Sequence, residues 1–489
     1  MAEDPYDGHE LPERGFRLFL GHAVGGTQVT SLTRGAEAAE AGHFDSRAAR
    51  LAHGKALRQR VPRSSHALWT PPRDRRDVVE QIEDSCRGRL PDLLPIRYGR
   101  MADSPFGFLR GAAAVMARDL ASTPTTGLRV QLCGDAHLSN FGVFGTPERQ
   151  QVFDLNDFDE TLPGPWEWDV KRLATSLVVA GRVNRYGRSD IRRATRSAVR
   201  AYRRMLSAFA SMRYLDIWYS HLDLHSPPLP EDRVLRSLMA RAAGKARRRT
   251  GLHAFPRLTE SVRGQPRIRD NPPLIVHARD STAERTSRSF FERYLDTLPN
   301  ERRMLLDRYH VADVAQKVVG VGSVGLVCSV LLLLADRDLE DPLFLQTKQA
   351  TASALEPYLG ASPYPNHAQR VVIGQQLIQE ASDVFLGWSE LDGRDFYVRQ
   401  LRDMKYAYEI STLGPREFVG QAELCGAALA RAHARTGDPT TIAGYLGSGP
   451  AFDRAVTTFA EAYADQTDRD HAAFRKAIRN GRLPATLDV

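Results

Sequence analysis

The stretch CGDAHLSNFG, residues 133–142, places an aspartate, a histidine and an asparagine within six positions. A carboxylate in such a loop can orient an attacking hydroxyl group or accept its proton, and an amide oxygen can bind Mg²⁺, which prefers hard oxygen ligands. We therefore expect Asp135 to be the catalytic base or orienting group, and Asn140 to be a metal ligand. The alternative is an ordinary polar turn. His137 has no second His or Cys at ligand spacing nearby, so we interpret it as a hydrogen-bonded loop residue.

A second group of acids lies in VFDLNDFDE, residues 152–160. We expect an acid of this stretch to join Asn140 at the metal, with Asp157 and Asp154 as the candidates. If both lie on one strand, their separation of three residues points them to opposite faces, so one of them would be structural. A solvated turn is the alternative. Asp169 opens a predicted helix, where simple capping and a catalytic role fit equally well.

The stretch GVGSVG, residues 320–325, has the spacing G-x-G-x-x-G. The residues after it favour a strand over a helix, which predicts a strand–glycine loop–strand unit of the kind that covers nucleotide phosphates in protein-kinase-type folds. Its glycines would allow backbone N–H groups to approach phosphate oxygens. We therefore expect nucleotide contacts from four residues, Gly320, Gly322, Ser323 and Gly325. The alternative is a plain hairpin turn.

Lys348 ends the apolar run PLFLQTKQA, in a chain with only seven lysines among 67 basic residues. A lysine at the end of such a strand can contact the α- and β-phosphates of a nucleotide if a carboxylate holds it in place. Glu356 is the nearest candidate for that carboxylate, and Glu380 is the second. The alternative is a lysine that extends along the surface to water.

Apolar periodicity and turn residues predict a mixture of helices and strands. The expected helices cover residues 104–121, 167–182, 190–209, 287–316, 351–380 and 422–435. Strands are expected within 127–136 and 150–160, which would form a small hairpin, within 317–347, and within 382–401, where Asp392-Gly393 favours a tight turn. Residues 251–283 are rich in Pro and Arg and are expected to form an excursion.

The bulk properties narrow the class of protein. A chain of 489 residues is too long for one simple core, so we expect two or three lobes. Four distant cysteines and the lack of a signal-peptide pattern favour a reducing compartment, and we expect a cytoplasmic protein. Residues 318–335 are uncharged, but their glycines and serines argue against a membrane span.

The net charge of +8 is weak support for a nucleic-acid partner, because acids and bases are interspersed. A binding protein that uses patches such as KARRRTG, residues 245–251, is the third hypothesis for the function. Aromatic residues are not interleaved with these basic runs, as a stacking platform for bases would need. We therefore expect no nucleic-acid partner.

Three motifs together, GDAHLSN, NDFDE and GPWEWDVKRL, resemble the catalytic segment of aminoglycoside-phosphotransferase-like members of the protein-kinase-like superfamily. More closely, PIRYGRMADSPFGFLRG, GDAHLSNFGVFGTPE, VFDLNDFDETLPGPWEWDVKRLATSLVVAGR and SDVFLGWSELDGRDFYVRQLRDMK resemble the bacterial domain-of-unknown-function 2252 family. That closer resemblance covers about residues 60–480 and implies a kinase-like fold. It leaves the substrate and the reaction open.

By this resemblance Asp135 matches the catalytic aspartate, Asn140 the metal-binding asparagine and Asp157 the metal-binding acid of the D-F-x motif. Lys348 matches the phosphate lysine, and the three glycines of GVGSVG match the glycine loop. The stretch RQLRD, residues 399–403, matches the hinge whose backbone would meet the adenine, through Gln400 and Leu401. Cys133 stands where these phosphotransferases often carry the histidine of H-G-D.

In ordinary kinases the glycine loop and the lysine precede the catalytic loop, whereas here they follow it by nearly two hundred residues. We therefore expect an α+β, bilobal, kinase-like fold that is circularly permuted. The expected parts are a loosely docked tail (1–75), a helical catalytic lobe (76–316), an inserted strand-rich nucleotide lobe (317–405) and helices that complete the catalytic lobe (406–489). The helix that precedes the catalytic loop in other kinases would be ALARAHAR, residues 428–435, with 104–121 as the competing candidate.

These features predict an ATP- and Mg²⁺-dependent phosphotransferase that acts on a hydroxyl acceptor, with a small molecule favoured by analogy. The same motifs would also serve a nucleotide-binding pseudokinase or an enzyme that transfers the nucleotidyl group (AMPylation).

Overall fold

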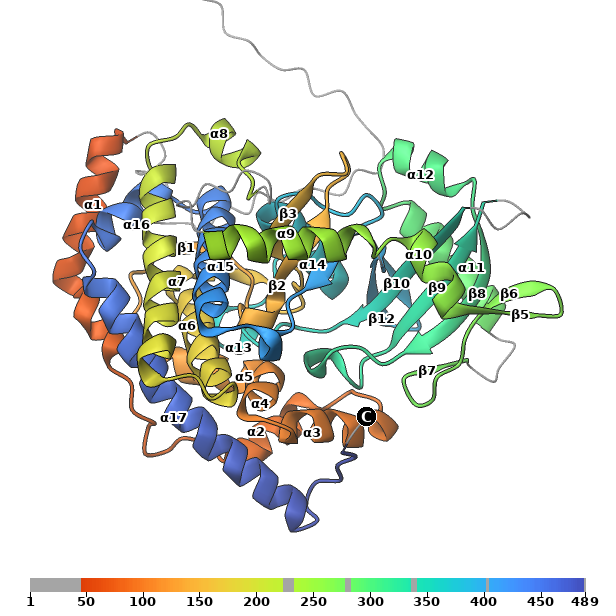
Figure 1. Cartoon of the computed structure of the whole chain (residues 1–489), viewed down its shortest axis with the longest axis horizontal. Coiled ribbons are helices and arrows are strands. Elements are labelled where there is room, and N and C mark those ends of the chain that lie inside the picture. The colour runs from red at the N-terminus through yellow and green to blue at the C-terminus, as the bar shows by residue number, and fades with distance from the viewer. Residues whose placement is uncertain (1–44, 223–232, 278–282, 336–340, 402–403, 488–489) are drawn as a thin grey trace, which may run out of the picture. The chain divides into compact units, whose positions relative to one another are not determined.

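The computed structural model describes residues 45–222, 233–277, 283–335, 341–401 and 404–487. The chain divides into two units, Met1–Phe44 and Asp45–Val489, and everything below concerns the second unit. It has a mixed α+β architecture, with helices at both ends of the unit and most strands between them (Figure 1). Residues 1–44 of the predicted tail lie outside the described residues.

Long helices form the larger part of the structure. α7 (Arg188–Phe209) packs along α15 (Pro415–Thr436), and α6 (Trp166–Val183) packs against α17 (Ala451–Arg479) and α7 (Figure 1). α7 is strongly amphipathic, which explains why one of its faces is buried. Gly426 of α15 lies against the backbone of Ala198, and any side chain there would clash with that backbone. Helices from residues 166–209 and 415–479 thus build one body.

The expectation of a loosely docked tail is wrong for residues 47–67. α1 (Arg47–Arg60) packs on α16 (Pro439–Leu446), and a short 3₁₀ helix (Arg63–Ala67) packs on α17. Gly54 and Gly444 allow the close approach of α1 and α16. Within the 3₁₀ helix, His66 is fully buried. Small residues such as Gly54 weaken the apolar periodicity of α1, so the sequence did not predict this helix. The same small residues make its contact with α16.

Within the described residues, the main sheet is antiparallel, has six strands and runs in the order β11-β12-β10-β9-β8-β7. Its strands are β7 (Ile275–Val276), β8 (His310–Lys317), β9 (Cys328–Leu334), β10 (Pro342–Ala350), β11 (Gly387–Leu391) and β12 (Arg394–Gln400). Asp392 and Gly393 both have positive φ, as the predicted β11–β12 turn requires.

The strand-rich part begins earlier than predicted. Residues 310–316 were expected to be helical but form β8, which pairs with β9. Residues before 317 also supply the helices that cover the sheet, because α11 (Ala283–Leu295) and α12 (Asn300–Leu306) share an apolar cluster with it. The predicted boundary at residue 317 is therefore too late. The predicted excursion carries α10 (Gly251–Leu258) and a hairpin of β5 (Thr259–Val262) and β6 (Gln265–Ile268).

Two small sheets frame the loop at residues 133–142. β1 (Arg129–Leu132) pairs with β4 (Leu162–Pro165), and β2 (Phe141–Gly145) pairs with β3 (Gln151–Leu155) and β13 (Tyr406–Ala407). The predicted hairpin of residues 127–136 with 150–160 is therefore wrong. The loop itself continues into β2, which takes the place next to β3.

The other helices are short. The predicted helix at 104–121 is broken at Ala112 into α4 (Pro105–Gly111) and α5 (Ala113–Leu120). The remaining helices are α2 (Val78–Ser85), α3 (Leu94–Ala102), α8 (Tyr214–Tyr219), α9 (Arg233–Arg247), α13 (Glu356–Leu359) and α14 (His367–Ile378). Among the described residues, no helix is long and apolar enough to cross a membrane.

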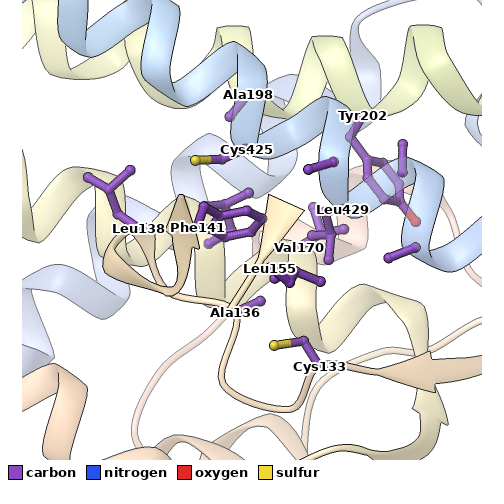
Figure 2. Packing of buried hydrophobic residues seen from close by; sticks show 14 of the residues in the cluster. Cys133, Ala136, Leu138, Phe141, Leu155, Val170, Ala198, Tyr202, Cys425 and Leu429 are labelled. Carbon is purple, nitrogen blue, oxygen red and sulfur yellow. The ribbon is translucent and has the colours of Figure 1, made fainter. Parts of the chain in front are cut away.

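The apolar residues of the loop anchor it to the helical body. Ala136, Leu138 and Phe141 are buried in one cluster with Val170 of α6 and Leu429 of α15 (Figure 2). The polar residues of the loop, Asp135, His137, Ser139 and Asn140, line a cavity. The largest core cluster of the described residues therefore carries the loop on its surface.

Candidate functional site

Asp169 of α6 binds the backbone at the start of the loop at residues 133–142. The N–H groups of Cys133 and Gly134 donate to its carboxylate at 2.7 Å and 3.0 Å, and the Nε2 atom of His433 lies 3.2 Å from it. Gly134 has a φ of 86° and lies against the backbone of Glu160, so a side chain there would be strained and would clash. Asp169 thus positions the loop, and it neither caps its own helix nor lines the cavity described below.

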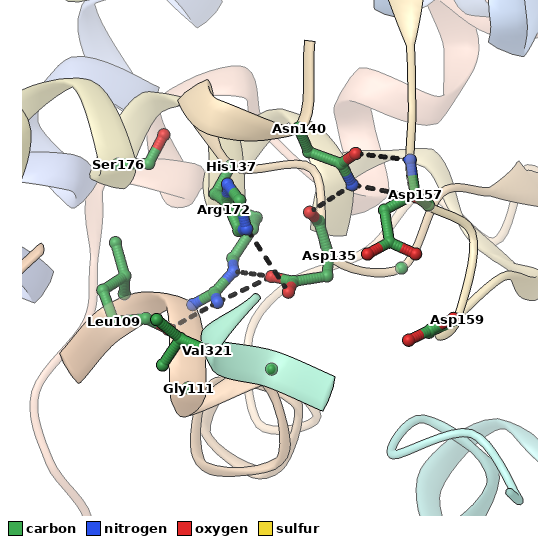
Figure 3. A network of polar contacts seen from close by, with 12 residues as sticks. Leu109, Gly111, Asp135, His137, Asn140, Asp157, Asp159, Arg172, Ser176 and Val321 are labelled. Atoms are coloured by element: carbon green, nitrogen blue, oxygen red, sulfur yellow. Dashed lines mark hydrogen bonds and ion pairs between the residues drawn. The ribbon is translucent and has the colours of Figure 1, made fainter. Parts of the chain in front are cut away.

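Asn140 ties the loop to the acids that follow β3. Its Nδ2 group donates to the carbonyl oxygens of Asp135, at 3.1 Å, and Asp157, at 2.9 Å. Its Oδ1 atom accepts from the N–H of Asp157 at 2.7 Å (Figure 3). A carbonyl oxygen keeps a second lone pair, so Oδ1 can still serve a metal ion.

Asp135 is paired with a residue that the sequence analysis missed. Arg172 of α6 lies 2.7 Å from the Oδ1 atom of Asp135 and also donates to the carbonyl of Leu109 (Figure 3). Arg172 is almost fully buried and comes one helical turn after Asp169. That spacing on one face of a predicted helix was the available signal.

His137 lies in the loop, but its side chain does not make the predicted hydrogen bond: its Nδ1 atom has no hydrogen-bond partner among the described residues. Its Nε2 atom lies 3.7 Å from the Oδ2 atom of Asp135, and its ring meets Phe106 edge-on. Burial lowers the pKa of His137 to about 4, so the ring is neutral at pH 7. It lines the cavity but offers no strong charge to a ligand.

The acids after β3 separate into two environments. Asp154 is fully buried, forms an ion pair with Arg431 of α15 and accepts from the N–H of Glu380. Asp157 instead faces the cavity, where desolvation and the nearby Asp159 raise its pKa. This corrects the assignment of Asp154 to the metal and leaves Asp157 as the candidate ligand. β3 ends at Leu155, so Asp157 lies beyond the strand, and the alternation argument, which required both acids on one strand, does not apply.

Lys348 is buried, so it does not extend along the surface to water, and its partners are acids of the same stretch. Its Nζ atom lies 2.5 Å from Asp159 and 3.4 Å from Asp157. Asp159 also accepts from the hydroxyl groups of Tyr397, at 2.9 Å, and Ser323, at 3.1 Å. Burial opposes the ionisation of Asp159, but Lys348, the hydroxyl group of Tyr397 and Arg399 outweigh it and lower its pKa to about 2.

Neither predicted partner of Lys348 contacts it. Glu356 accepts from the N–H of Ser353 at 3.0 Å and lies 3.9 Å from Arg370, while Glu380 accepts from the N–H of Leu222 at 3.1 Å. The expectation for Glu356 and Glu380 is therefore wrong. The acidic stretch after β3 reaches Lys348 first, because its backbone is tied to the loop by Asn140.

The glycine loop joins β8 to β9, which confirms the predicted strand–loop–strand unit. Arginines that follow α2 or lie in α3 hold its carbonyl groups. Arg97 donates to the carbonyl groups of Val321, at 2.7 Å, and Gly322, at 2.9 Å. Arg89 donates to the carbonyl group of Val324 at 2.7 Å. Arg100 donates to the carbonyl group of Val319 at 2.5 Å. Gly325 has a φ of 92° and closes the turn. The sequence analysis did not foresee this arginine clamp.

These parts meet at a cavity of about 380 Å³, which we call the central cavity. Acids, amides, guanidinium groups and the glycine loop all contribute to its lining. The lining includes Asp135, Asn140, Asp157, Asp159, Gly320, Gly322, Ser323, Arg89, Arg97, Arg110 and Arg399. Gly325 lies outside this lining, packed against Arg89. A cavity with both signs of charge and a glycine loop can take a polyanion together with its counter-cation.

A second cavity of about 340 Å³ adjoins the first and shares Asn156, Arg399 and Ala407 with it. Leu401 lines this second cavity, whereas Gln400 does not. The N–H of Gln400 donates to Asp383 at 2.5 Å, and that of Leu401 donates to the carbonyl of Phe344 at 2.9 Å. The backbone N–H groups of both residues, whose backbone was expected to meet an adenine, are therefore occupied. Residues 402–403 of the predicted hinge lie outside the described residues.

Comparison with known proteins gives one match. A family model described as an uncharacterized protein conserved in bacteria (DUF2252) matches residues 89–477. No curated protein and no solved structure matches the chain.

Proposed function

This chain belongs to the bacterial DUF2252 family, and we propose that it is an ATP- and Mg²⁺-dependent phosphotransferase. The acceptor is the hydroxyl group of a small molecule. One observation carries the proposal: the central cavity brings the loop at 133–142, the acid Asp157 and the glycine loop to one place. Lys348 does not line the cavity itself but is paired to two acids that do, Asp157 and Asp159. Each of these parts has a distinct role in phosphoryl transfer.

The fold that we infer is kinase-like and circularly permuted. Protein kinases carry the glycine loop in their first strand pair and the lysine on the third strand. Here β8, the glycine loop, β9 and β10 with Lys348 follow one another in this order, but they come after the catalytic loop in the chain. His433 of α15 lies against Asp169 below that loop, which favours α15 over the broken helix at 104–121 as the helix that precedes the loop in other kinases.

The donor set fits Mg²⁺. Asp157 and the Oδ1 atom of Asn140 are hard oxygen donors at the same cavity, and the raised pKa of Asp157 reflects a site that a cation would relieve. Among the described residues, no group of three or more His, Cys, Asp or Glu side chains could hold a metal ion alone. This suits Mg²⁺, which takes one or two carboxylates and completes its shell with phosphate and water. When bound, the ion would neutralise phosphate charge.

The chain's own groups then have defined tasks. The glycine loop and Lys348 hold the phosphates, and Asp135 orients the acceptor hydroxyl group and receives its proton. Arg172 fixes the Oδ1 atom of Asp135 at 2.7 Å, which leaves the Oδ2 atom for the acceptor. Positioning and charge supply most of the catalysis in this scheme.

Calorimetry with ATP, with and without Mg²⁺, tests the proposal. Wild type should bind ATP in an Mg²⁺-dependent way, and Lys348→Met should weaken that binding about 10–100-fold, because a charge-assisted contact contributes about 1.5–3 kcal/mol. Lys476→Met, at an exposed lysine of α17, is the matched control and should bind like wild type. Wild type that shows no Mg²⁺-dependent ATP binding would sink the proposal.

Labelled nucleotide identifies the transferred group. Label from the γ-phosphate on an acceptor from a bacterial metabolite extract supports phosphotransfer. Label from the α-phosphate instead would show nucleotidyl transfer, and binding without either product would show a pseudokinase.

A further inference from the structure

Arg110, near the end of α4, lies where two cavities meet. It lines the central cavity and also a larger cavity of about 660 Å³, which we call the outer cavity. Ser139 of the catalytic loop and Gly320 and Val321 of the glycine loop complete the shared wall. The two cavities therefore adjoin at Arg110 and these three residues.

The charge of Arg110 acts on the two central acids of the site. Its Nε atom is buried and has no hydrogen-bond partner among the described residues. Desolvation lowers the pKa of Arg110, and the carboxylates of Asp135 and Asp157 act in the opposite direction. Because Nε is inaccessible, an anionic ligand would meet the terminal nitrogens of this guanidinium, which lines both cavities.

The outer cavity differs from the central one in what it can bind. Carboxylates, hydroxyl groups, an amide and aromatic rings share its lining, which includes Asp103, Ser104, Phe106, Asn184, Tyr408 and Glu409. This mixture suits a polar small molecule with hydroxyl groups rather than a polyphosphate. The glycine loop and the acids Asp157 and Asp159 line only the central cavity or its shared wall, so a nucleotide belongs there.

We propose that the outer cavity is the acceptor site and that Arg110 is a catalytic residue whose guanidinium contacts the phosphoryl group during transfer. This rests on the proposed phosphotransferase function. The acceptor oxygen forms a bond to the γ-phosphorus and gives its proton to Asp135, while the bond from that phosphorus to the bridging oxygen breaks and ADP leaves with the electron pair. Arg110 stays protonated and offsets the charge on the equatorial oxygens.

The test uses Mg·ADP with aluminium fluoride, a mimic of the phosphoryl group in transfer that needs no known acceptor. In calorimetry, fluoride should tighten the binding of Mg·ADP to wild type by about 100-fold or more. Arg110→Met should bind Mg·ADP within about threefold of wild type but lose the tightening. Arg110→Lys, which keeps the charge without the planar fork, should lose at least about tenfold of it.

Arg118→Met is the matched control, because Arg118 is an exposed arginine on the neighbouring helix α5, and it should retain the full tightening. Full tightening in Arg110→Met or Arg110→Lys would overturn the role of Arg110. Wild type that binds Mg·ADP without any tightening by fluoride would overturn it too, while nucleotide binding would stand. Wild type that binds no nucleotide would show that the proposed function itself has failed.

Discussion

Lys348 shows how one buried cation organises the site. Its ammonium lies between Asp157 and Asp159, and Asp159 is further held by Tyr397 and Ser323. A buried ammonium needs both charge pairing and hydrogen bonds to offset the loss of water. Asp159 thereby joins the lysine to the glycine loop and takes the part that the sequence analysis assigned to Glu356.

We expect Asp159→Asn to weaken Mg·ATP binding about tenfold or more, because Lys348 loses its closest counter-charge and with it its fixed position. Glu356→Gln is the control, since Gln can still accept from the N–H of Ser353, and it should stay within about twofold of wild type. Nucleotide titrations of the three proteins check this. Equal losses in both variants would contradict the role of Asp159.

Lys171 is a second buried lysine, outside the site, and it predicts a pH effect on stability. Its Nζ atom has no hydrogen-bond partner among the described residues, and burial lowers its pKa to about 7 despite Glu167 nearby. Between pH 7 and the ordinary value near 10.5, the unfolded chain binds a proton that the folded chain has released. Stability therefore rises with pH across this window, and the penalty is fully present below pH 7.

We expect Lys171→Met to have a higher thermal midpoint than wild type at pH 7, with the difference shrinking as the pH approaches 10. Thermal unfolding of both proteins at matched pH values measures this. A difference that does not change with pH would show that Lys171 does not titrate in this window.

At the scale of elements, α3 and the segment after α2 hold the glycine loop by its carbonyl groups. Arg97 contributes two bonds to the loop and a third to the carbonyl of Gly111 at the end of α4, and it is 2% exposed. Because the carbonyl groups are bound on one side, the loop is held against the helical body. It is a fixed wall of the central cavity and not a free flap.

We expect Arg97→Met to lower the free energy of unfolding by about 2–4 kcal/mol, since buried carbonyl groups lose charge-assisted donors. Hydrogen exchange should speed up in residues 318–327, where the clamp is lost. Arg87→Met is the control: Arg87 is exposed and makes a surface ion pair with Asp84, so its loss should cost at most about 1 kcal/mol. Unchanged exchange in Arg97→Met would contradict the clamp.

At the scale of the whole chain, segments far apart in sequence meet beneath the site. Asp154 of β3 pairs with Arg431 of α15 across 277 residues, and Asp169 of α6 meets His433 across 264. Helix α15 therefore supports both the loop at 133–142 and the strand that carries Asp154. The helices at the two ends of the described unit act as one body under the site.

Asp154→Asn and Asp157→Asn should distinguish the acid that stabilises the fold from the acid that supports Mg²⁺-dependent ATP binding. Asp154→Asn leaves Arg431 buried without a counter-charge and should cost about 3–5 kcal/mol of stability, with Mg²⁺-dependent ATP binding retained by the folded protein. Asp157→Asn should lose the Mg²⁺ dependence with little change in thermal midpoint. Chemical denaturation and calorimetry on both variants measure this, and loss of the Mg²⁺ effect in Asp154→Asn alone would reverse the assignment.

The sequence predicted the helices, strands and turns that depend on patterns of neighbouring residues. The β11–β12 hairpin follows from Asp392-Gly393, the glycine-loop unit follows from its glycines and apolar flanks, and α7 follows from its period. It missed β8, because the polar residues of this exposed strand carry no clear alternation. It also missed α1, whose contact surface is made by small residues.

By itself, the sequence determined the chemical groups of the candidate site and their local spacing. Asp135, Asn140 and Asp157 were named from one short region, because hard oxygen donors and a turning loop are properties of neighbouring residues. Only the tertiary structure decided which charges are paired, with Arg172 on Asp135, Asp159 on Lys348 and Arg431 on Asp154. These pairings depend on which groups are buried together, and burial is decided by the packing of segments up to 277 residues apart.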